Sequence, residues 1–356
     1  MRRAWLVLAC LLMLPVAVRA AGCVVLCYHH IDTPGPKVGK SGVEYFVPPA
    51  DFAAQMEHLK TEGYHVVPLA AVVDAYHGKG TLPDRAVAIT MDDGWKCANT
   101  NALPVLKQYG FPVTLFIYPA MIGKAGDKNT YDDYKAFAAD PNVTIACHSW
   151  SHPNLLKDGE KVKGAAHDAW LQKEYVQSRA ELEKKLGMPI RWLAYPYGLY
   201  DAQVSALVKQ AGYEAAFSVN GAPNSAKSDP MFLNRTMILH SDGLKGFARK
   251  VGTLPLMVEG QDPPDGATIP PGIRKVSVHI VDPDALPGSI QLIMGSRHGT
   301  VDPATGVGTI AIDKPLTGHM YQIAAQAKDK TTGKLRAASW LVRVKPGASK
   351  PPGEVE

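Results

Sequence analysis

From about residue 23 to residue 220, short apolar runs alternate with segments whose apolar residues recur at helical spacing. Short apolar runs bounded by turn residues predict buried strands, and spacings of three and four residues predict helices. We expect strands at 24–28, 65–69, 86–90, 113–117, 143–147, 192–195 and 215–218. We expect helices from Phe52 through Leu59, and at 102–109, 170–186 and 202–211, with Gly187 ending the third. Repeated strand–helix units predict an α/β fold with a largely parallel sheet, in the form of a (β/α) barrel or a distorted version of one.

After about residue 258 the pattern changes to alternating apolar and polar positions without a helical stretch. Strands are expected at 276–280, 290–293, 308–312, 321–327 and 340–344, separated by clusters of turn residues. This spacing predicts a small all-β sandwich of immunoglobulin-like type over residues 258–346. Trp340 and Tyr321 are expected in its core rather than on a sugar-binding surface. Residues 347–356 are expected to form a disordered tail.

The first residues have the pattern of an export signal. Met1-Arg2-Arg3 precedes an apolar run at 4–18, and Ala20 follows as a small residue suited to cleavage. The apolar run is shorter than the ~20 residues that span a bilayer. We therefore expect a signal peptide at 1–20, an exported protein in the periplasm, at the outer membrane or outside the cell, and an α/β domain at 21–257.

The charge of the chain argues against a nucleic-acid partner. The formal net charge is +5, and loss of residues 1–20 removes three arginines and no acids, which leaves +2. A charge this small gives little electrostatic attraction to nucleic acid, and no run of Lys or Arg alternates with aromatic residues.

Four cysteines remain after the signal peptide: Cys23, Cys27, Cys97 and Cys147. An exported compartment permits disulfides, and four cysteines allow three pairings that the sequence does not distinguish. Cys23 offers an alternative, because Ala21-Gly22-Cys23 is similar to the end of a bacterial lipobox and would anchor the protein to the outer membrane. Simple cleavage is favoured over lipidation, since Ala20 stands where such motifs prefer Leu.

Two acidic residues end an apolar strand. Asp92 and Asp93 are followed by Gly94, which permits a sharp turn, and by Trp95. Sites in parallel α/β folds are built at the carboxyl ends of strands. Two adjacent carboxylates repel one another unless a cation or a proton compensates. The alternative is a pair of capping residues at the start of the next helix.

A second polar motif also follows an apolar strand. His148 and His152 are four residues apart, so both imidazoles can share one face of a helical turn and hold one ion. Two histidines with one aspartate leave coordination positions open, as in a hydrolytic metal site. A third motif, Tyr195-Pro196-Tyr197-Gly198, is either a proline-fixed turn or a wall of the groove, with a backbone N–H directed at an oxyanion.

These motifs resemble those of the polysaccharide deacetylases of the NodB-homology type, carbohydrate esterase family 4. The family marks are Thr-Phe-Asp-Asp-Gly, present with Met91 for Phe, and His-Ser/Thr-x-x-His, present intact. The resemblance covers roughly residues 23–250 and implies a deformed (β/α) barrel. It also implies a divalent metal, zinc first and nickel or cobalt as alternatives, held by Asp93, His148 and His152. Asp92 would be the base that activates the attacking water, with Trp95, Tyr195, Pro196 and Tyr197 facing the substrate.

Two departures point to a subgroup. Ala194 stands where the family has the arginine that clamps the base, and the family's Asp/Trp motif is not found. Both departures, with Tyr28-His29-His30 at the first strand, resemble the subgroup that de-N-acetylates poly-β-1,6-N-acetylglucosamine in biofilm matrices. The subgroup implies His29 as the general acid. His240 is the alternative, because the wider family uses a Leu-His near the end of the domain.

The resemblance leaves the substrate open among several polymers. Besides poly-β-1,6-N-acetylglucosamine, chitin oligomers, peptidoglycan and acetylated xylan are alternatives, as is a non-catalytic module that binds glycan. The expected partners are the polysaccharide itself and other proteins of exopolysaccharide export.

Overall fold

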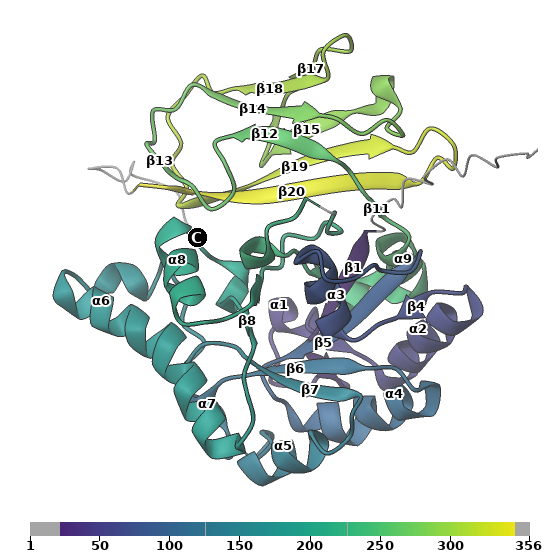
Figure 1. Cartoon of the computed structure of the whole chain (residues 1–356), viewed down its shortest axis with the longest axis vertical. Helices are drawn as coiled ribbons and strands as arrows, with labels where there is room; N and C mark the ends of the chain where they lie inside the picture. The colour runs from purple at the N-terminus through teal and green to yellow at the C-terminus, as the bar shows by residue number, and fades with distance from the viewer. Residues whose placement is uncertain (1–21, 125, 226, 346–356) are drawn as a thin grey trace, which may run out of the picture.

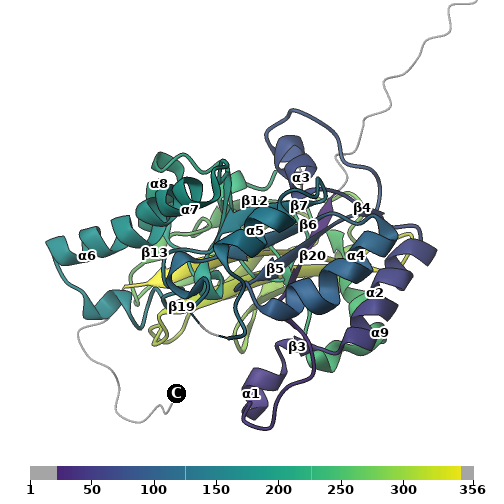
Figure 2. The same cartoon turned by 90° about the horizontal axis from the view of Figure 1, so that it is seen from below.

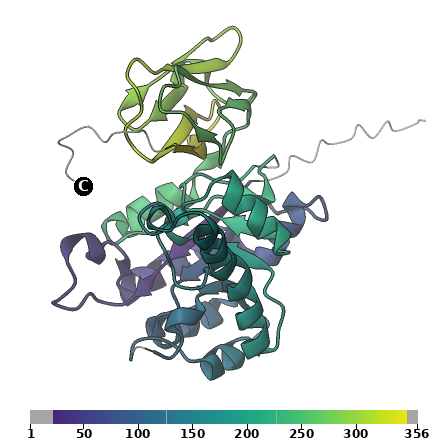
Figure 3. The same ribbon diagram turned by 90° about the vertical axis from the view of Figure 1, so that its left-hand side faces the viewer.

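The computed structural model describes residues 22–124, 126–225 and 227–345, so the expected signal peptide and the expected tail at 347–356 lie outside the described residues. The chain forms an α/β layer with an all-β layer against one side of it (Figure 1). Figure 3 shows the same two parts from the side, with the β-strands of the last third of the chain gathered above the helices.

The α/β part is built on a parallel sheet, as the alternating pattern predicts. Its strands follow the order β10-β1-β5-β6-β7-β8-β9, with β4 also paired to the start of β5, and every pair is parallel. The strands are β1 (Cys23–Tyr28), β4 (His65–Val66), β5 (Ala86–Asp92), β6 (Val113–Ile117), β7 (Val143–Cys147), β8 (Trp192–Ala194), β9 (Ala215–Phe217) and β10 (Thr236–Met237). A separate short pair joins β2 (His30–Ile31) to β3 (Phe46–Val47).

One segment, residues 233–237, links the two edges of this sheet. Leu233 exchanges backbone hydrogen bonds with the β9 edge, through Ala216 at 3.0 Å and Ser218 at 2.8 Å. Three residues later, Thr236 and Met237 pair with β1. The sheet is therefore a half-barrel whose open side is spanned by this segment, in agreement with the predicted distorted barrel.

Helices cover the side of the sheet away from the all-β layer, where α4, α5 and α7 lie (Figure 1 and Figure 2). The α-helices are α1 (Lys40–Val43), α2 (Pro49–Thr61), α3 (Leu69–Tyr76), α4 (Leu103–Tyr109), α5 (Tyr131–Phe137), α6 (Ala165–Leu171), α7 (Ser178–Leu186), α8 (Ala202–Gln210) and α9 (Gly243–Val251). Phe52, Met56 and Leu59 of α2 are fully buried, as their spacing predicts. Within the described residues, the helices lack the length and the apolar composition of a membrane span.

The strand expected at 65–69 is wrong in its second half. Pairing stops after Val66, and Pro68 precedes the first residue of α3, Leu69. Proline fixes its own φ and has no N–H to give to a sheet, so it suits the start of a helix better than a central strand. The helix expected at 170–186 is present as α6 and α7 joined by a π-helical stretch, and Gly187 ends it in the left-handed conformation with φ of 73°.

The all-β part consists of two sheets around one apolar core, which includes Trp340 but leaves Tyr321 only partly buried against it. One sheet has the order β11-β20-β19-β15-β16 with β13 on β20, and the other has the order β12-β14-β18-β17. The strands are β11 (Leu254–Pro255), β12 (Val258–Asp262), β13 (Thr268–Ile269), β14 (Lys275–Ile280), β15 (Gln291–Met294), β16 (Arg297–His298), β17 (Thr300–Val301), β18 (Val307–Ala311), β19 (Met320–Lys328) and β20 (Leu335–Val344). We call this part the β-sandwich.

Strand β20 joins the β-sandwich to the half-barrel. Trp340 and Val342 point into the sandwich core, whereas Leu341 belongs to the apolar core of the half-barrel. Alternate residues of a strand point to opposite faces, so one strand contributes to both cores. Asp265 lies at the same junction, where its Oδ1 accepts hydrogen bonds from the Tyr200 hydroxyl at 2.6 Å and the Leu341 N–H at 3.0 Å.

The four cysteines within the described residues are free thiols, so none of the three pairings is formed. Cys23 and Cys27 are fully buried in β1, and Cys147 is fully buried in β7. A lipid on Cys23, raised above as an alternative, would require its strand to open. Burial raises the pKa of Cys23 to about 12, which makes this thiol a poor nucleophile.

Asp265 generates a prediction about stability. Burial raises the pKa of Asp265 to about 6, from 3.8 in the unfolded chain, so the folded protein binds the proton more tightly. The contribution of Asp265 to the free energy of unfolding therefore falls as the pH rises from about 4 to about 6. We expect Asp265→Asn to raise the free energy of unfolding at pH 7 by roughly 1–2 kcal/mol, with the gain vanishing near pH 4. Urea unfolding at both pH values measures it. The exposed Asp313→Asn is the control, and a gain independent of pH would contradict the prediction.

Candidate active site

The carboxyl ends of the parallel strands open into one pocket of about 360 Å³. The predicted residues that line it are His29, Asp92, Asp93, Trp95, His148, His152, Tyr195 and Tyr197, together with Tyr45, Phe46 and Arg235, which the sequence did not single out. Its volume is within the range of small-molecule sites, and its walls combine aromatic rings with a few charged groups. The motifs that follow three different strands thus meet in one cavity.

Asp93, His148 and His152 converge on a common point in this pocket. The Asp93 Oδ1 atom lies 3.8 Å from Nε2 of His148 and 3.6 Å from Nε2 of His152. Zn–N and Zn–O bonds of about 2.0–2.1 Å at tetrahedral angles place two donor atoms roughly 3.3 Å apart, close to these separations. The Asp93 Oδ1 is buried and has no hydrogen-bond partner. A buried carboxylate oxygen without a partner, facing two imidazole nitrogens, fits a divalent cation.

The imidazoles are prepared for ligation. Nδ1 of His148 lies 2.7 Å from the carbonyl oxygen of Ala194, so Nδ1 carries the hydrogen and Nε2 presents its lone pair to the site. Burial and, to a smaller degree, the neighbouring His148 together lower the pKa of His152 to about 4. His152 is therefore neutral at pH 7, which is the form that binds a metal.

The backbone of the site is strained. Of the five residues other than glycine with positive φ in the described chain, four line or adjoin the pocket: Asp93 (71°), Ser149 (66°), His152 (58°) and Tyr197 (56°). Such conformations cost of order 1–3 kcal/mol each and persist where the surroundings enforce them. Their concentration at one pocket indicates that the fold accepts a local cost in stability in order to direct these side chains into the pocket.

The helical turn expected for His148 and His152 is wrong. Residues 148–152 form a loop after β7, in which Ser149 and His152 have left-handed backbone conformations. The Ser149 hydroxyl accepts a hydrogen bond from the His152 N–H at 3.0 Å and fixes the turn. The two imidazole rings still lie 4.6 Å apart, because the loop folds back rather than winding into a helix.

Trp95 and Lys128 support Asp93. The indole N–H of Trp95 donates to Asp93 Oδ2 at 3.3 Å, and the Lys128 ammonium donates to the Asp93 carbonyl oxygen at 2.9 Å. The Lys128 ammonium also lies 2.9 Å from the centre of the Trp95 ring, and His30 packs on that ring at 4.1 Å. These contacts leave Trp95 better suited to orienting the metal ligand than to stacking on a sugar.

Asp92 has a different environment from Asp93. Arg235, fully buried, forms two hydrogen bonds with its carboxylate, Nη1 to Oδ1 at 2.6 Å and Nη2 to Oδ2 at 2.8 Å. Burial raises the pKa of Asp92, but the Arg235 charge and these hydrogen bonds outweigh burial and hold the pKa well below its usual range. The carboxylate is therefore ionised and fixed in direction.

Arg235 corrects the expectation that the clamp on the base is missing. Ala194 indeed leaves the third motif without an arginine, but the segment before β10 supplies one instead. The sequence gives no local signal for this, because Arg235 and Asp92 are 143 residues apart. The one available hint is that Arg235 stands among polar residues just before an apolar strand.

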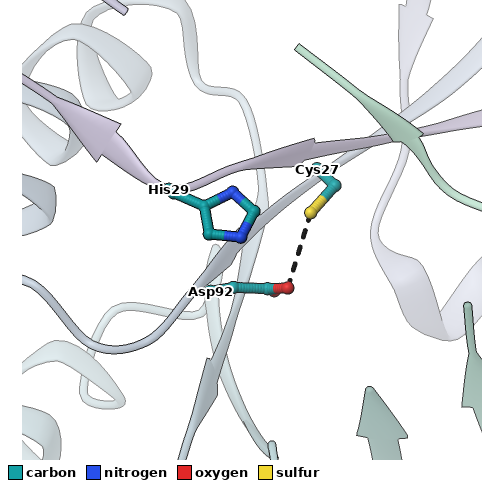
Figure 4. Close-up of side chains that lie close together, drawn as sticks. All are labelled: Cys27, His29 and Asp92. Atoms are coloured by element: carbon teal, nitrogen blue, oxygen red, sulfur yellow. Dashed lines mark hydrogen bonds between the residues drawn. The ribbon is translucent and has the colours of Figure 1, made fainter. Parts of the chain in front are cut away.

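A second cluster lies beside the first. One ligand-type atom from each of Cys27, His29 and Asp92 lies within 4.8 Å of the other two, and Figure 4 shows the His29 ring and the Cys27 thiol next to each other, both facing the Asp92 side chain. The Cys27 thiol donates to Asp92 Oδ2 at 3.4 Å. Because Arg235 already binds both Asp92 oxygens, a cation here would face the guanidinium charge. The Asp93 cluster is the better metal site.

His29 and His240 are separated by the fold. His29 lines the pocket, its Nδ1 is buried without a hydrogen-bond partner, and the Tyr45 ring lies 5.0 Å away. Burial lowers the pKa of His29, against the opposing effect of Asp92 and Asp93. His240 is not among the lining residues, and its Nδ1 faces the Phe46 carbonyl oxygen at 3.1 Å. The structure therefore brings His29, not His240, to the other polar groups.

The third motif divides between core and pocket. Tyr195 is fully buried and its hydroxyl donates to the Met231 carbonyl oxygen at 3.2 Å, and Pro196 is buried as well. Tyr197 is 55% exposed at the pocket, with its ring 4.7 Å from that of His152. Tyr197 is therefore the member of this motif that a bound sugar could contact.

The comparisons with known proteins point to polysaccharide deacetylases. The family model "Polysaccharide deacetylase" matches residues 79–216. Poly-beta-1,6-N-acetyl-D-glucosamine N-deacetylase of Staphylococcus aureus (strain MRSA252) is 27% identical over 198 residues, which cover 54% of this chain and 68% of that protein. The protein of the same name from Escherichia coli (strain K12) is 23% identical over 240 residues, 56% of this chain, and the match spans about a third of its length, 34%.

Solved structures show the same fold. IcaB from Ammonifex degensii matches with a TM-score of 0.57 and 23% identity, over 65% of this chain and 98% of that one. The Streptococcus pyogenes deacetylase PplD in complex with acetate matches with a TM-score of 0.57 and 22% identity, over 65% of this chain and 99% of that one. The half-barrel of this chain therefore has the same fold as these two deacetylase structures. Residues 79–216 thus form a polysaccharide deacetylase domain, and the similarity to these deacetylases indicates that the chain is an enzyme.

The geometry predicts which side chains hold a metal. We expect His152→Ala to weaken zinc binding at least about a hundredfold, because one of three ligands is lost. His240→Ala is the matched control and should bind zinc as the unchanged protein does. Calorimetric titration of the metal-free chain with zinc measures both. Equal zinc affinity in His152→Ala and the unchanged chain would exclude His152 as a ligand.

Proposed function

We propose that the chain is a metal-dependent hydrolase that removes N-acetyl groups from a polysaccharide containing N-acetylglucosamine. The observation that carries the proposal is that two carboxylates adjacent in sequence have different partners: one faces two imidazoles and the other is bound by a guanidinium. Asp93 faces His148 and His152, whereas Asp92 is held by Arg235. One carboxylate is thus available to a cation and the other to a proton, which is the division that amide hydrolysis by activated water requires.

Asp93, His148 and His152 would hold the cation, zinc first and nickel or cobalt as alternatives. When bound, a divalent cation at these residues would polarise the acetyl carbonyl and make water more acidic. The residues of this chain contribute the rest. The unpartnered Oδ1 of Asp93 and the two Nε2 atoms supply one negative charge and two neutral donors, a set that leaves room for substrate and water.

Asp92 would accept the proton of the attacking water. Its low pKa keeps it ionised at the start of the reaction, and Arg235 keeps its oxygens in one direction. Because the Arg235 guanidinium stabilises the ionised form of Asp92, Asp92 is a weak base, and a proton that it accepts must be passed on quickly. The backbone N–H of Tyr197 would donate to the oxyanion that forms on the acetyl group.

His29 would return that proton to the nitrogen of the leaving amine. Because burial lowers its pKa, His29 is neutral at rest and acquires a proton during the reaction. A ligand-type atom of His29 lies within 4.8 Å of one of Asp92, so the proton taken by Asp92 has a short path to it. The N–C bond breaks as the amine nitrogen receives this proton, and acetate and a free amino sugar leave.

The substrate we propose is poly-β-1,6-N-acetylglucosamine of an exopolysaccharide or biofilm matrix. The relatives from Staphylococcus aureus and Escherichia coli carry this substrate in their names. The exposed rings of Tyr45 and Tyr197 at the pocket are suited to the apolar faces of sugars. Deacetylation of chitin oligomers, peptidoglycan or acetylated xylan is the alternative with the same chemistry.

We also propose an exported protein, on the pattern of residues 1–20, with a deacetylase domain at 21–257 and a β-sandwich domain at 258–346. Other exopolysaccharide export proteins would be its partners. An immunoglobulin-like type for the β-sandwich rests on the spacing of its strands.

Asp92 is tested by a substitution that keeps its shape. We expect Asp92→Asn to lower kcat for acetate release at least about a thousandfold, because an amide cannot accept the proton. Zinc content should stay the same, since Asp92 is not among the proposed ligands. Acetate assays and metal analysis on the same sample measure both. Turnover near that of the unchanged chain would remove Asp92 from the role of base.

The substrate is tested by comparing polymers. We expect acetate release from β-1,6-linked N-acetylglucosamine oligomers to exceed release from chitin oligomers, peptidoglycan and acetylated xylan by about tenfold or more in kcat/KM. A chelator should abolish the activity, and added zinc, nickel or cobalt should restore it. Faster release from acetylated xylan would show that acetylated xylan, not the β-1,6-linked polymer, is the substrate. Glycan binding without any acetate release would refute the proposed enzymatic activity.

A further inference from the structure

We propose that the β-sandwich takes part in catalysis, with Ser339 of β20 as a positioning residue for Arg235 and, through it, for Asp92. The inference rests on the proposed role of Asp92 as base. It assigns the β-sandwich a function within the same site, rather than glycan binding or simple attachment.

Arg235 uses its whole guanidinium group to join Asp92 to the backbone of a neighbouring loop. Its Nη atoms bind Asp92, and its Nε donates to the Ser218 carbonyl oxygen at 3.1 Å. The carbonyl oxygen of Arg235 in turn accepts from the Gly221 N–H at 3.0 Å. Since a guanidinium is planar and its donors are fixed relative to one another, a shift of Ser218 turns the group that holds Asp92.

Asn234 connects this loop to the β-sandwich. Its Oδ1 accepts from the Ser218 hydroxyl at 3.1 Å, and its Nδ2 donates to the Ser339 carbonyl oxygen at 3.2 Å. Asn234 directly precedes Arg235, so the same segment carries the clamp and the contact to β20. The position of β20 therefore influences both ends of the Arg235 side chain.

A second connection runs through Asn220. Its carbonyl oxygen accepts from the Ser339 hydroxyl at 2.8 Å and from the side-chain amide of Gln322 on β19. Its own N–H donates to the Ser218 hydroxyl at 3.3 Å. Ser339 thus binds both loops that meet at Ser218, one by its hydroxyl and one by its carbonyl group.

These groups are shielded from water. Ser218 and Arg235 are fully buried, and Asn220, Asn234 and Ser339 are at most 9% exposed. Inside a protein, a network of this kind fixes geometry strongly, because each group left without a partner is costly. Attachment of the β-sandwich to the half-barrel alone would not require a polar network that ends on the Asp92 carboxylate.

Contacts elsewhere between the two parts offer a comparison. Nδ1 of His319, in the loop before β19, lies 3.3 Å from Oε1 of Glu160, and the His319 side chain is about half exposed. This pair holds the β-sandwich against the half-barrel but touches none of the residues around Arg235. His319→Ala is therefore a matched control for the loss of one contact between the two parts.

The test compares Ser339→Ala, Ser339→Thr and His319→Ala in the full, zinc-loaded chain. We expect Ser339→Ala to lower kcat about tenfold with KM within about twofold, because a misplaced base slows the reaction but not binding. Ser339→Thr keeps the hydroxyl and should recover most of the rate. His319→Ala should keep the kcat of the unchanged chain, and zinc content should be equal in all four proteins.

Hydrogen exchange supplies a readout that needs no activity. We expect backbone amides at 218–224 and 232–235 to exchange faster in Ser339→Ala but not in His319→Ala. An unchanged kcat in Ser339→Ala, an equal loss in His319→Ala, or unchanged exchange in these loops would overturn the inference. If the unchanged chain releases no acetate, the proposed function fails instead, and the exchange data still decide whether β20 orders the loops.

Discussion

The site depends on the buried pair of Arg235 and Asp92. Two carboxylates adjacent in sequence would compete for the same cation if both were free. The guanidinium removes Asp92 from that competition by binding both of its oxygens, and it keeps Asp92 charged despite complete burial. Removing either partner of such a pair would leave an uncompensated buried charge, which typically costs 3–5 kcal/mol. Every role proposed for the neighbouring groups assumes this division between Asp92 and Asp93.

The rest of the molecule serves to bring this pair together. Asp92 ends β5 in the middle of the sheet, while Arg235 lies on the segment that spans the open side of the half-barrel. That segment is held by β9 on one edge, by β1 on the other and by β20 behind it. Closure of the sheet and attachment of the β-sandwich therefore act on the same few residues, and the strained backbone at Asp93 and His152 completes the arrangement.

The sequence predicts those features that local chemistry determines. Apolar runs predict the central strands, and Asp93, His148 and His152 are recognisable because each follows such a run. Features that depend on distant parts of the chain are missed, such as Arg235, which lies 143 residues from its partner Asp92. The left-handed turn at 149–152 is missed as well, because it contains no glycine that would indicate positive φ. The strand expected to reach Leu69 ends early because Pro68 has no N–H to give to a sheet and instead precedes the first residue of α3.

X-ray absorption at the zinc edge of the zinc-loaded chain tests the central claim most directly, because the two candidate clusters differ in one element. A cation held by Asp93, His148 and His152 has only nitrogen and oxygen neighbours, at about 2.0–2.1 Å, with outer scattering from two imidazole rings. A cation held by Cys27, His29 and Asp92 has a sulfur neighbour at about 2.3 Å. We expect the first spectrum. A sulfur shell would show that Asp92 is a ligand rather than a base, and would contradict the account.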